Sequence, residues 1–219
     1  MTGLALTGRA PRLSLLALLA VYLAVWPHEL GHAAVARLYG CKADPWTTDT
    51  NWYLAGSQGG AIDEGCLARH GGGAPALMAL GGVAVNLLLL ALAPLLGRWW
   101  LPARTAGGGV RWGLVATLFW ALANAAEALS YLVVNTVWLH ADMEIVARAG
   151  LGRWAWTAAG LVLGVMIVWG LRRPVRKAAA VLAESFADGG LSERLWRWGF
   201  AAYALAVGVA AVVSRALFS

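Results

Sequence analysis

The sequence predicts an all-α integral membrane protein with about five transmembrane helices and a short Gly-rich loop or hairpin after the first. Composition is the first observation behind this prediction: of the 219 residues, 60% are apolar and only 13% are charged, and the mean hydropathy is +0.66. These values are typical of a membrane protein. The second observation is that apolar runs long enough to cross a bilayer, which takes about 20 helical residues, recur along the chain.

Five such runs predict the membrane spans, and they lie near residues 13–39, 74–97, 110–140, 154–171 and 196–217. The first run is longer than the apolar region of a signal peptide and carries polar residues, so we expect it to remain in the mature protein. The longest polar stretch, 41–73, is too short and too Gly-rich to form an independent core. Residues 1–219 are therefore expected to form a single polytopic membrane domain.

The 17 Lys and Arg residues indicate the orientation of the chain and its class of partner. They are spread between the spans without an aromatic-basic motif, which argues against nucleic acid as a partner. Of the 17, 11 fall on the side of the N-terminus, so the positive-inside rule predicts a cytoplasmic N-terminus. Some of these residues lie near an amphipathic helix predicted over 174–188, which would rest on the cytoplasmic membrane surface or form a solvated connection.

The polar loop after the first span carries two further features. Cys41 and Cys66 flank the loop, and they can form a disulfide if the loop faces an oxidising compartment, or remain free thiols. Residues 46–56 have the Thr, Trp and Tyr content of a short strand, and several glycines follow. This segment is expected to form either a hairpin edge at the membrane boundary, able to hold an extended peptide, or a plain surface loop.

Three polar residues inside the first run, His28, Glu29 and His32, form the pattern H-E-x-x-H. On a helix, residues four apart lie on the same face, so both imidazoles can bind one Zn²⁺ ion. Glu29 would lie beside the metal, where a carboxylate can accept a proton from water and pass it to a leaving amine. Ionisable groups are costly to bury in a membrane and tend to mark functional sites. The pattern predicts a zinc-dependent hydrolase, whereas polar groups hydrogen-bonded between helices are the alternative.

A catalytic zinc ion takes about three protein ligands, and two carboxylates compete to be the third. If the third span is a straight helix rising about 1.5 Å per residue, Glu127 lies at nearly the depth of the histidines. Asp142 reaches that depth only if the chain bends near Asn135 and a new helix starts at the edge of the membrane. Asp63 and Glu64 in the polar loop are lesser alternatives.

Several segments together resemble the site-2 protease family, which comprises intramembrane zinc metalloproteases that cut membrane-embedded substrates. These segments are "HELGHAAVARLYG", "AGSQGG" at 55–60, "ALGGVAVN" ending at Asn86, and "YLVVNTVWLHAD" ending at Asp142. The resemblance covers about residues 20–145. The chain departs from the family where Gly81-Gly82 replaces the usual Gly-Pro, and where Met143 replaces the Gly that usually follows the Asp.

The resemblance implies a cofactor, a set of site residues and a kind of substrate. The cofactor is Zn²⁺, the metal ligands are His28, His32 and Asp142, and the catalytic residues are Glu29, Asn86 and Asn135. The two asparagines would donate hydrogen bonds to an oxyanion, unless they only join helices. The implied partners are a membrane-embedded protein or peptide substrate and the lipid bilayer, in a bacterial or archaeal cell membrane. The alternative is a non-proteolytic membrane metal-binding protein that acts as a sensor, transporter or scaffold.

Overall fold

The computed structural model describes residues 9–48, 60–107, 109–139, 142–150 and 152–185. In these parts the regular structure is helical, apart from one isolated bridge between Arg104 and Val110. Four segments are long and apolar enough to cross a membrane, namely Leu15–Leu38, Gly73–Gly97, Trp112–Trp138 and Arg153–Leu182. The described part of the chain is therefore consistent with the predicted all-α membrane class and contains four candidate spans. The expected fifth run, 196–217, and most of the expected hairpin edge lie outside the described residues.

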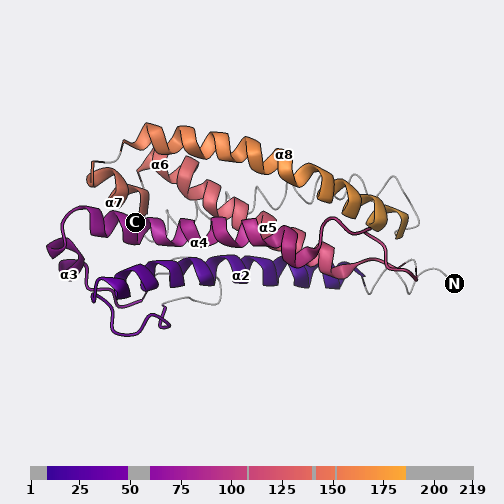
Figure 1. Ribbon diagram of the computed structural model, residues 1–219, viewed down its shortest axis with the longest axis horizontal. Coiled ribbons are helices and arrows are strands. Elements are labelled where there is room, and N and C mark those ends of the chain that lie inside the picture. The colour runs from indigo at the N-terminus through magenta and orange to yellow at the C-terminus, as the bar shows by residue number, and fades with distance from the viewer. Residues whose placement is uncertain (1–8, 49–59, 108, 140–141, 151, 186–219) are drawn as a thin grey trace.

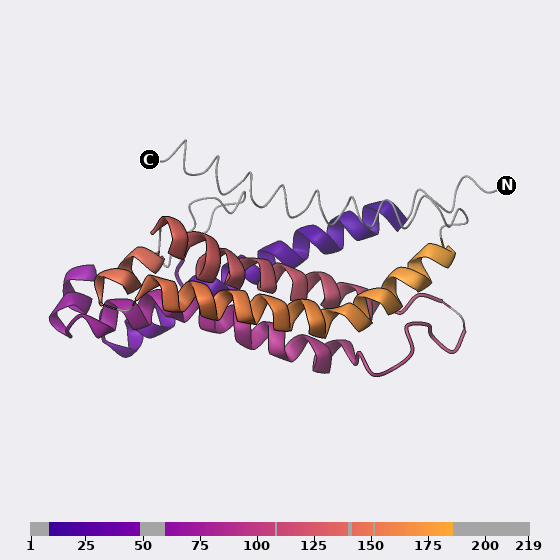
Figure 2. The same cartoon turned by 90° about the horizontal axis from the view of Figure 1, so that it is seen from above.

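The long helices lie side by side and alternate in direction (Figures 1 and 2). They are α2 (Arg9–Leu38), α4 (Gly73–Gly97), α5 (Trp112–Leu129) and α8 (Arg153–Ser185), and the short α3 (Glu64–Arg69) precedes α4. Helices α2, α4 and α5 pack against one another, while α8 packs on the third span. The polar motif of α2 therefore faces the interior of a helix bundle.

Glycines allow α2 and α4 to approach closely at the level of the motif. A Cβ atom added to Gly31 would lie 2.5 Å from the carbonyl oxygen of Gly81, and one added to Gly81 would lie 2.6 Å from the carbonyl oxygen of Gly31. No larger residue fits at such distances, and small residues are the usual means by which membrane helices pack tightly. The glycine inside "HELGH" thus places the motif directly against the "GG" of the second span.

The third span changes its helical form before it ends. Helix α5 continues as a π-helix, η1 (Ser130–Asn135), and then as one turn of α6 (Thr136–Trp138). The turn ends at Leu139, whose φ of 49° is left-handed. Helix α7 (Asp142–Arg148) follows, and its Met143 and Val146 pack on α4. A helix starts at Asp142, as expected. The expected break near Asn135 comes later, because the helix continues through Asn135 to Trp138 and ends at Leu139.

The structure differs from the sequence-based expectation at the end of the fourth span. A span ending near residue 171 and a separate amphipathic helix over 174–188 were expected, but α8 runs through Pro174 without interruption to Ser185. Leu171 and Ala178 are buried in one cluster with Leu114 and Leu118 of α5. The buried side of this segment therefore packs on α5, and this packing favours continuation of the helix. Residues 186–188 lie outside the described residues.

Candidate metal centre

The two histidines of the motif lie on one face of α2 and point toward a carboxylate. His28 and His32 are buried, with 0% and 5% of their surface exposed, and their ring centroids are 4.7 Å apart. The Nε2 atom of His28 lies 3.8 Å from Oδ2 of Asp142, and that of His32 lies 3.2 Å from the same oxygen. One ligand atom from each of these residues lies within 4.8 Å of the other two. The fold thus brings together the three residues expected to bind the metal.

Hydrogen bonds fix which nitrogen of each imidazole faces the carboxylate. Nδ1 of His28 lies 2.5 Å from Oδ1 of Asn86, and Nδ1 of His32 lies 2.8 Å from the carbonyl oxygen of Met78. Because both partners are acceptors, each Nδ1 donates a hydrogen bond, and each Nε2 is left facing the carboxylate, where it can carry a proton or, without that proton, bind a metal. This arrangement, in which a second atom orients the ligand, is usual for histidines that bind a metal.

One of these Nε2 atoms has no hydrogen-bond partner within the described part of the protein. Nε2 of His28 is buried and forms no hydrogen bond in the described part of the chain. Leaving a buried polar atom unsatisfied costs about 1–3 kcal/mol, and a metal ion would satisfy it. Two imidazole nitrogens and one carboxylate oxygen are ligands that zinc accepts in catalytic sites. The residues present therefore fit a zinc ion.

Gly82 of α4 lies directly against both ligand nitrogens. A Cβ atom added there would lie 2.5 Å from Nε2 of His28 and 2.6 Å from Nε2 of His32. Bonds from zinc to imidazole nitrogen are about 2.0–2.1 Å long, so a methyl group would compete for the region that an ion bound to both nitrogens needs. Glycine at this position is therefore a requirement of the site as well as of helix packing.

Asn86 is fully buried, and its whole amide group is engaged. Its Oδ1 accepts from His28, and its Nδ2 donates to the carbonyl oxygen of Ala24 at 3.0 Å and to Oδ1 of Asn124 at 2.9 Å. Asn124 in turn donates to the carbonyl oxygen of Trp120 at 2.8 Å. These bonds join α2, α4 and α5 and leave neither N–H of Asn86 for a substrate. The two expected roles of Asn86 were to donate to an oxyanion or to join helices, and the geometry favours the second. The same contacts hold the ring of His28 in its orientation.

Two more ionisable groups and one aromatic ring surround the histidines. Glu29 is buried, and both Glu29 and Glu127 interact electrostatically with the histidines and with Asp142. Glu127 is not a member of the three-residue ligand group. The ring of Tyr131 stacks on that of His28, with centroids 4.6 Å apart and planes inclined by 28°. Tyr131 was not among the residues expected at the site, although its position four residues after Glu127 places both on one helix face.

Asp142 lies just beyond the third span, and its carboxylate is held in the ionised form. Burial raises its pKa, but the contacts with His28 and His32 outweigh burial and lower the pKa from 3.8 to about 2. The carboxylate is therefore ionised at neutral pH and ready to bind a cation. Asn135 ends η1 one turn after Tyr131, and its side chain makes no capping hydrogen bond to α6. Both N–H groups of Asn86 are already hydrogen-bonded, so Asn135 is the better candidate of the two expected oxyanion donors.

Comparison of the chain with protein-family models, with curated proteins and with solved structures finds no match. The resemblance to site-2 proteases therefore rests on the sequence motifs alone. The functional conclusion depends on these motifs together with the geometry of His28, His32 and Asp142.

Proposed function

We propose that this chain is an intramembrane zinc-dependent endopeptidase in which His28, His32 and Asp142 hold the metal. The observation that carries the proposal is the pair of Nε2 atoms, both fixed by acceptors at Nδ1, that face one carboxylate at 3.8 and 3.2 Å. Structural zinc sites usually take four protein ligands, whereas catalytic sites take three and keep a position open. The three ligands His28, His32 and Asp142 match the number found in the catalytic type.

The surrounding residues supply the remaining parts of a hydrolytic reaction. A bound zinc ion would supply Lewis acidity that activates water and polarises the carbonyl of a peptide bond. Glu29 would accept the proton of the attacking water and deliver it to the leaving amine. Asn135 would donate a hydrogen bond to the oxygen that becomes negatively charged. Asn86 would hold the His28 ring in its ligand orientation, because both of its N–H groups are already engaged.

The depth of the site determines the kind of substrate. At about 1.5 Å per residue, His32 lies about 9 Å and His28 about 15 Å below Leu38, where the first span ends. A peptide bond cut at this depth belongs to a membrane-embedded protein or peptide, in a cell membrane such as that of a bacterium or archaeon. The substrate must be locally unwound, because the hydrogen bonds of a helix shield its peptide groups.

Metal sensing, transport and a scaffold role are the competing functions. A transporter needs further ligands along a path across the membrane. Among the described residues, the second group with ligand spacing is Cys41, Cys66 and His70, and its two cysteines form a disulfide. None of the competing functions explains why Glu29 is buried beside the ligands.

Zinc content and cleavage measured together test the proposal. Detergent-purified wild type, His28→Ala and Glu29→Gln would be assayed by elemental analysis and with a transmembrane test peptide. We expect near-stoichiometric zinc and cleavage in wild type, neither in His28→Ala, and zinc without cleavage in Glu29→Gln. Cleavage by Glu29→Gln, or a wild type without zinc, would refute the proposal. Zinc without cleavage in wild type as well would favour a non-proteolytic metal-binding protein.

A further inference from the structure

The two ends of the helix bundle differ in charge. One end comprises the start of α2, the loop between α4 and α5, and the end of α8, which lie together at the right of Figure 1. The basic residues at this end are Arg9, Arg12, Arg98, Arg104, Arg111, Arg172, Arg173, Arg176 and Lys177, and the acidic residue among the described ones is Glu184. The opposite end comprises α3, α7 and the loops beside them, and we call it the disulfide end. Its basic residues are Arg37, Lys42, Arg69, Arg148 and Arg153, and its acidic residues are Asp44, Asp63, Glu64, Asp142 and Glu144.

Contacts support this division into two ends. The Nζ atom of Lys177 donates to the carbonyl oxygen of Trp99 at 3.5 Å, so the basic part of α8 lies beside the loop after α4. At the disulfide end, basic residues are paired with acidic ones: Arg148 lies 2.5 Å from Glu144 and Arg69 lies 4.0 Å from Asp63. Lys and Arg in short loops accumulate on the cytoplasmic side of membrane proteins. The charge pattern therefore places the disulfide end on the side opposite the cytoplasm.

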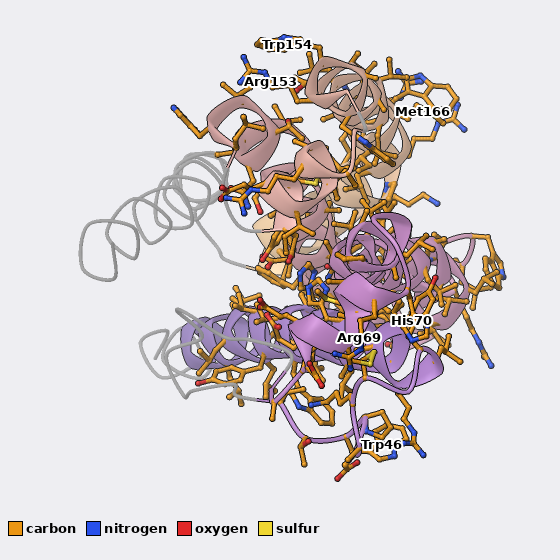
Figure 3. The ribbon with its side chains drawn as sticks, turned by 90° about the vertical axis from the view of Figure 1, so that its left-hand side faces the viewer. Trp46, Arg69, His70, Arg153, Trp154 and Met166 are labelled. Atoms are coloured by element: carbon orange, nitrogen blue, oxygen red, sulfur yellow. A yellow bond between two sulfur atoms is a disulfide. The ribbon has the colours of Figure 1, made fainter. Side chains whose placement is uncertain are left out.

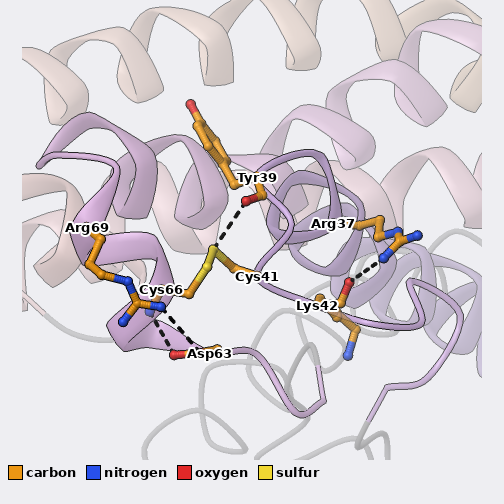
Figure 4. Close-up of a disulfide and its surroundings, with 7 residues drawn as sticks. All are labelled: Arg37, Tyr39, Cys41, Lys42, Asp63, Cys66 and Arg69. Atoms are coloured by element: carbon orange, nitrogen blue, oxygen red, sulfur yellow. Dashed lines mark hydrogen bonds and ion pairs between the residues drawn. A yellow bond between two sulfur atoms is a disulfide. The ribbon is translucent and has the colours of Figure 1, made fainter.

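The cysteines give a second and independent indication of orientation. Cys41 and Cys66 form a disulfide with a Cα–Cα distance of 5.4 Å, which connects the chain just after α2 to α3 (Figure 4). His70 and Arg69 lie at the same end of the bundle, which faces the viewer in Figure 3. Disulfides persist in oxidising compartments and are rare in the cytosol. Redox chemistry and charge thus assign the same end to the non-cytoplasmic side.

The metal centre lies nearer to the disulfide end than to the basic end. His32 is about 9 Å from Leu38 but about 26 Å from Leu15, the other end of the first span. His28 is about 15 Å from Leu38 and about 20 Å from Leu15. Asp142 begins α7, which itself belongs to the disulfide end. All three ligands therefore lie in one half of the membrane.

We propose that the metal centre lies in the half of the membrane opposite the cytoplasm, and that its substrates are membrane segments whose scissile bond lies in this non-cytoplasmic half. The hydrocarbon core is about 30 Å thick, so a bond in the cytoplasmic half would have to cross the midplane to reach the histidines. Cleavage would release the non-cytoplasmic part of the substrate and leave the cytoplasmic part anchored. The nature of the substrate rests on the proposed peptidase function, whereas the orientation does not.

Single cysteines at two open positions test the orientation without reference to activity. Gly72 lies between α3 and α4 at the disulfide end, Gly107 lies in the basic loop, and a Cβ atom at either position meets no atom within 4 Å. The variants Gly72→Cys and Gly107→Cys would be treated with a membrane-impermeant maleimide in intact cells. Wild type, whose two cysteines are paired, and permeabilised cells are the controls. Labelling of intact cells should be at least about tenfold stronger for Gly72→Cys.

Three labelling results would overturn the proposed orientation. They are stronger labelling of Gly107→Cys, equal labelling of both variants, and absence of labelling in intact cells when both variants react after permeabilisation. Mass spectrometry of alkylated wild type provides a second readout, because Cys41 and Cys66 should both resist alkylation until a reductant is added. Alkylation without reductant would show that Cys41 and Cys66 are not paired in the cell, and it would overturn the proposal.

Mapping the cut in a single-span test protein of known orientation tests the substrate class separately. We expect the cut among residues on the Gly72 side of the bilayer midplane. A cut on the Gly107 side would overturn the substrate class even if the labelling is as expected. No cleavage by wild type would overturn the peptidase function and the substrate class with it, while the labelling still decides the orientation.

Discussion

Replacing Gly82 by alanine tests the location of the metal with one added methyl group. The new Cβ atom would lie 2.5 Å from Nε2 of His28 and 2.6 Å from Nε2 of His32. Ordinary contacts of a Cβ atom begin near 3.4 Å, so each nitrogen would have to retreat by about 0.8–0.9 Å, whereas metal–ligand distances tolerate only about 0.2 Å. Retreat would also break the Nδ1 hydrogen bonds that hold both rings.

The expected result is a loss of zinc affinity greater than that caused by disturbing an outer residue. Removing a hydrogen-bond partner of a metal ligand typically weakens metal binding by about 10–100-fold. A methyl group at the ligand nitrogens should exceed this, so we expect at least about a 100-fold weakening for Gly82→Ala. The measurement is competition for zinc against a chromophoric chelator, with elemental analysis of the purified protein.

A glycine elsewhere in the spans controls for the substitution itself. At Gly164 in α8, an added Cβ atom lies 3.5 Å from the nearest atom of Leu129, which is an ordinary contact. Gly164→Ala should therefore bind zinc like wild type. If Gly82→Ala is folded and also binds zinc like wild type, the ion does not lie between His28 and His32, and the assignment of the site is wrong.

Further predictions concern the other residues of the site. Asp142→Ala should lose zinc measurable by elemental analysis, whereas Glu127→Gln should retain it; the opposite result would reassign the third ligand. Asn86→Ala removes the hydrogen-bond partner that orients His28, so it should weaken zinc binding about 10–100-fold in the chelator competition. Asn124→Ala should weaken it less, because Asn124 contacts Asn86 and not the histidine. Removing zinc with a chelator should lower the Tm of wild type, since metal at 100 times its Kd stabilises by about 2.7 kcal/mol. The same treatment should leave Gly82→Ala unchanged, and an unchanged wild-type Tm would contradict a site formed only in the folded state.

Sequence alone was sufficient for the features that depend on local spacing. The positions of His28 and His32 follow from the period of a helix, so their common face could be predicted from four residues of separation. The described spans likewise follow from apolar length and differ from the expected ranges mainly at their ends. Covalent pairing of Cys41 with Cys66 could not be decided, because it depends on the distance between α3 and the end of α2.

The third ligand required knowledge of tertiary geometry. Its position depends on the π-helix, on the left-handed Leu139 and on α7 returning to α4. π-Helical turns are short and occur often at functional sites, but hydrophobic periodicity does not reveal them. The continuation of α8 past Pro174 was missed for a related reason, since burial against α5 outweighs the local preference of proline to end a helix.

The contact between α2 and α4 links the stability of the fold to the assembly of the metal centre. Gly31 and Gly81 set the distance between the two backbones, and Gly82 allows α4 to lie against the ligand nitrogens. Asn86, one turn after Gly82, orients His28. An alanine at Gly31 or Gly81 should therefore separate the helices, lower the Tm and weaken zinc binding together. An alanine at Gly82 should block the metal while lowering the Tm of the metal-free protein less. If the three variants lost Tm and zinc affinity in the same proportion, the glycine at position 82 would be required for helix packing alone.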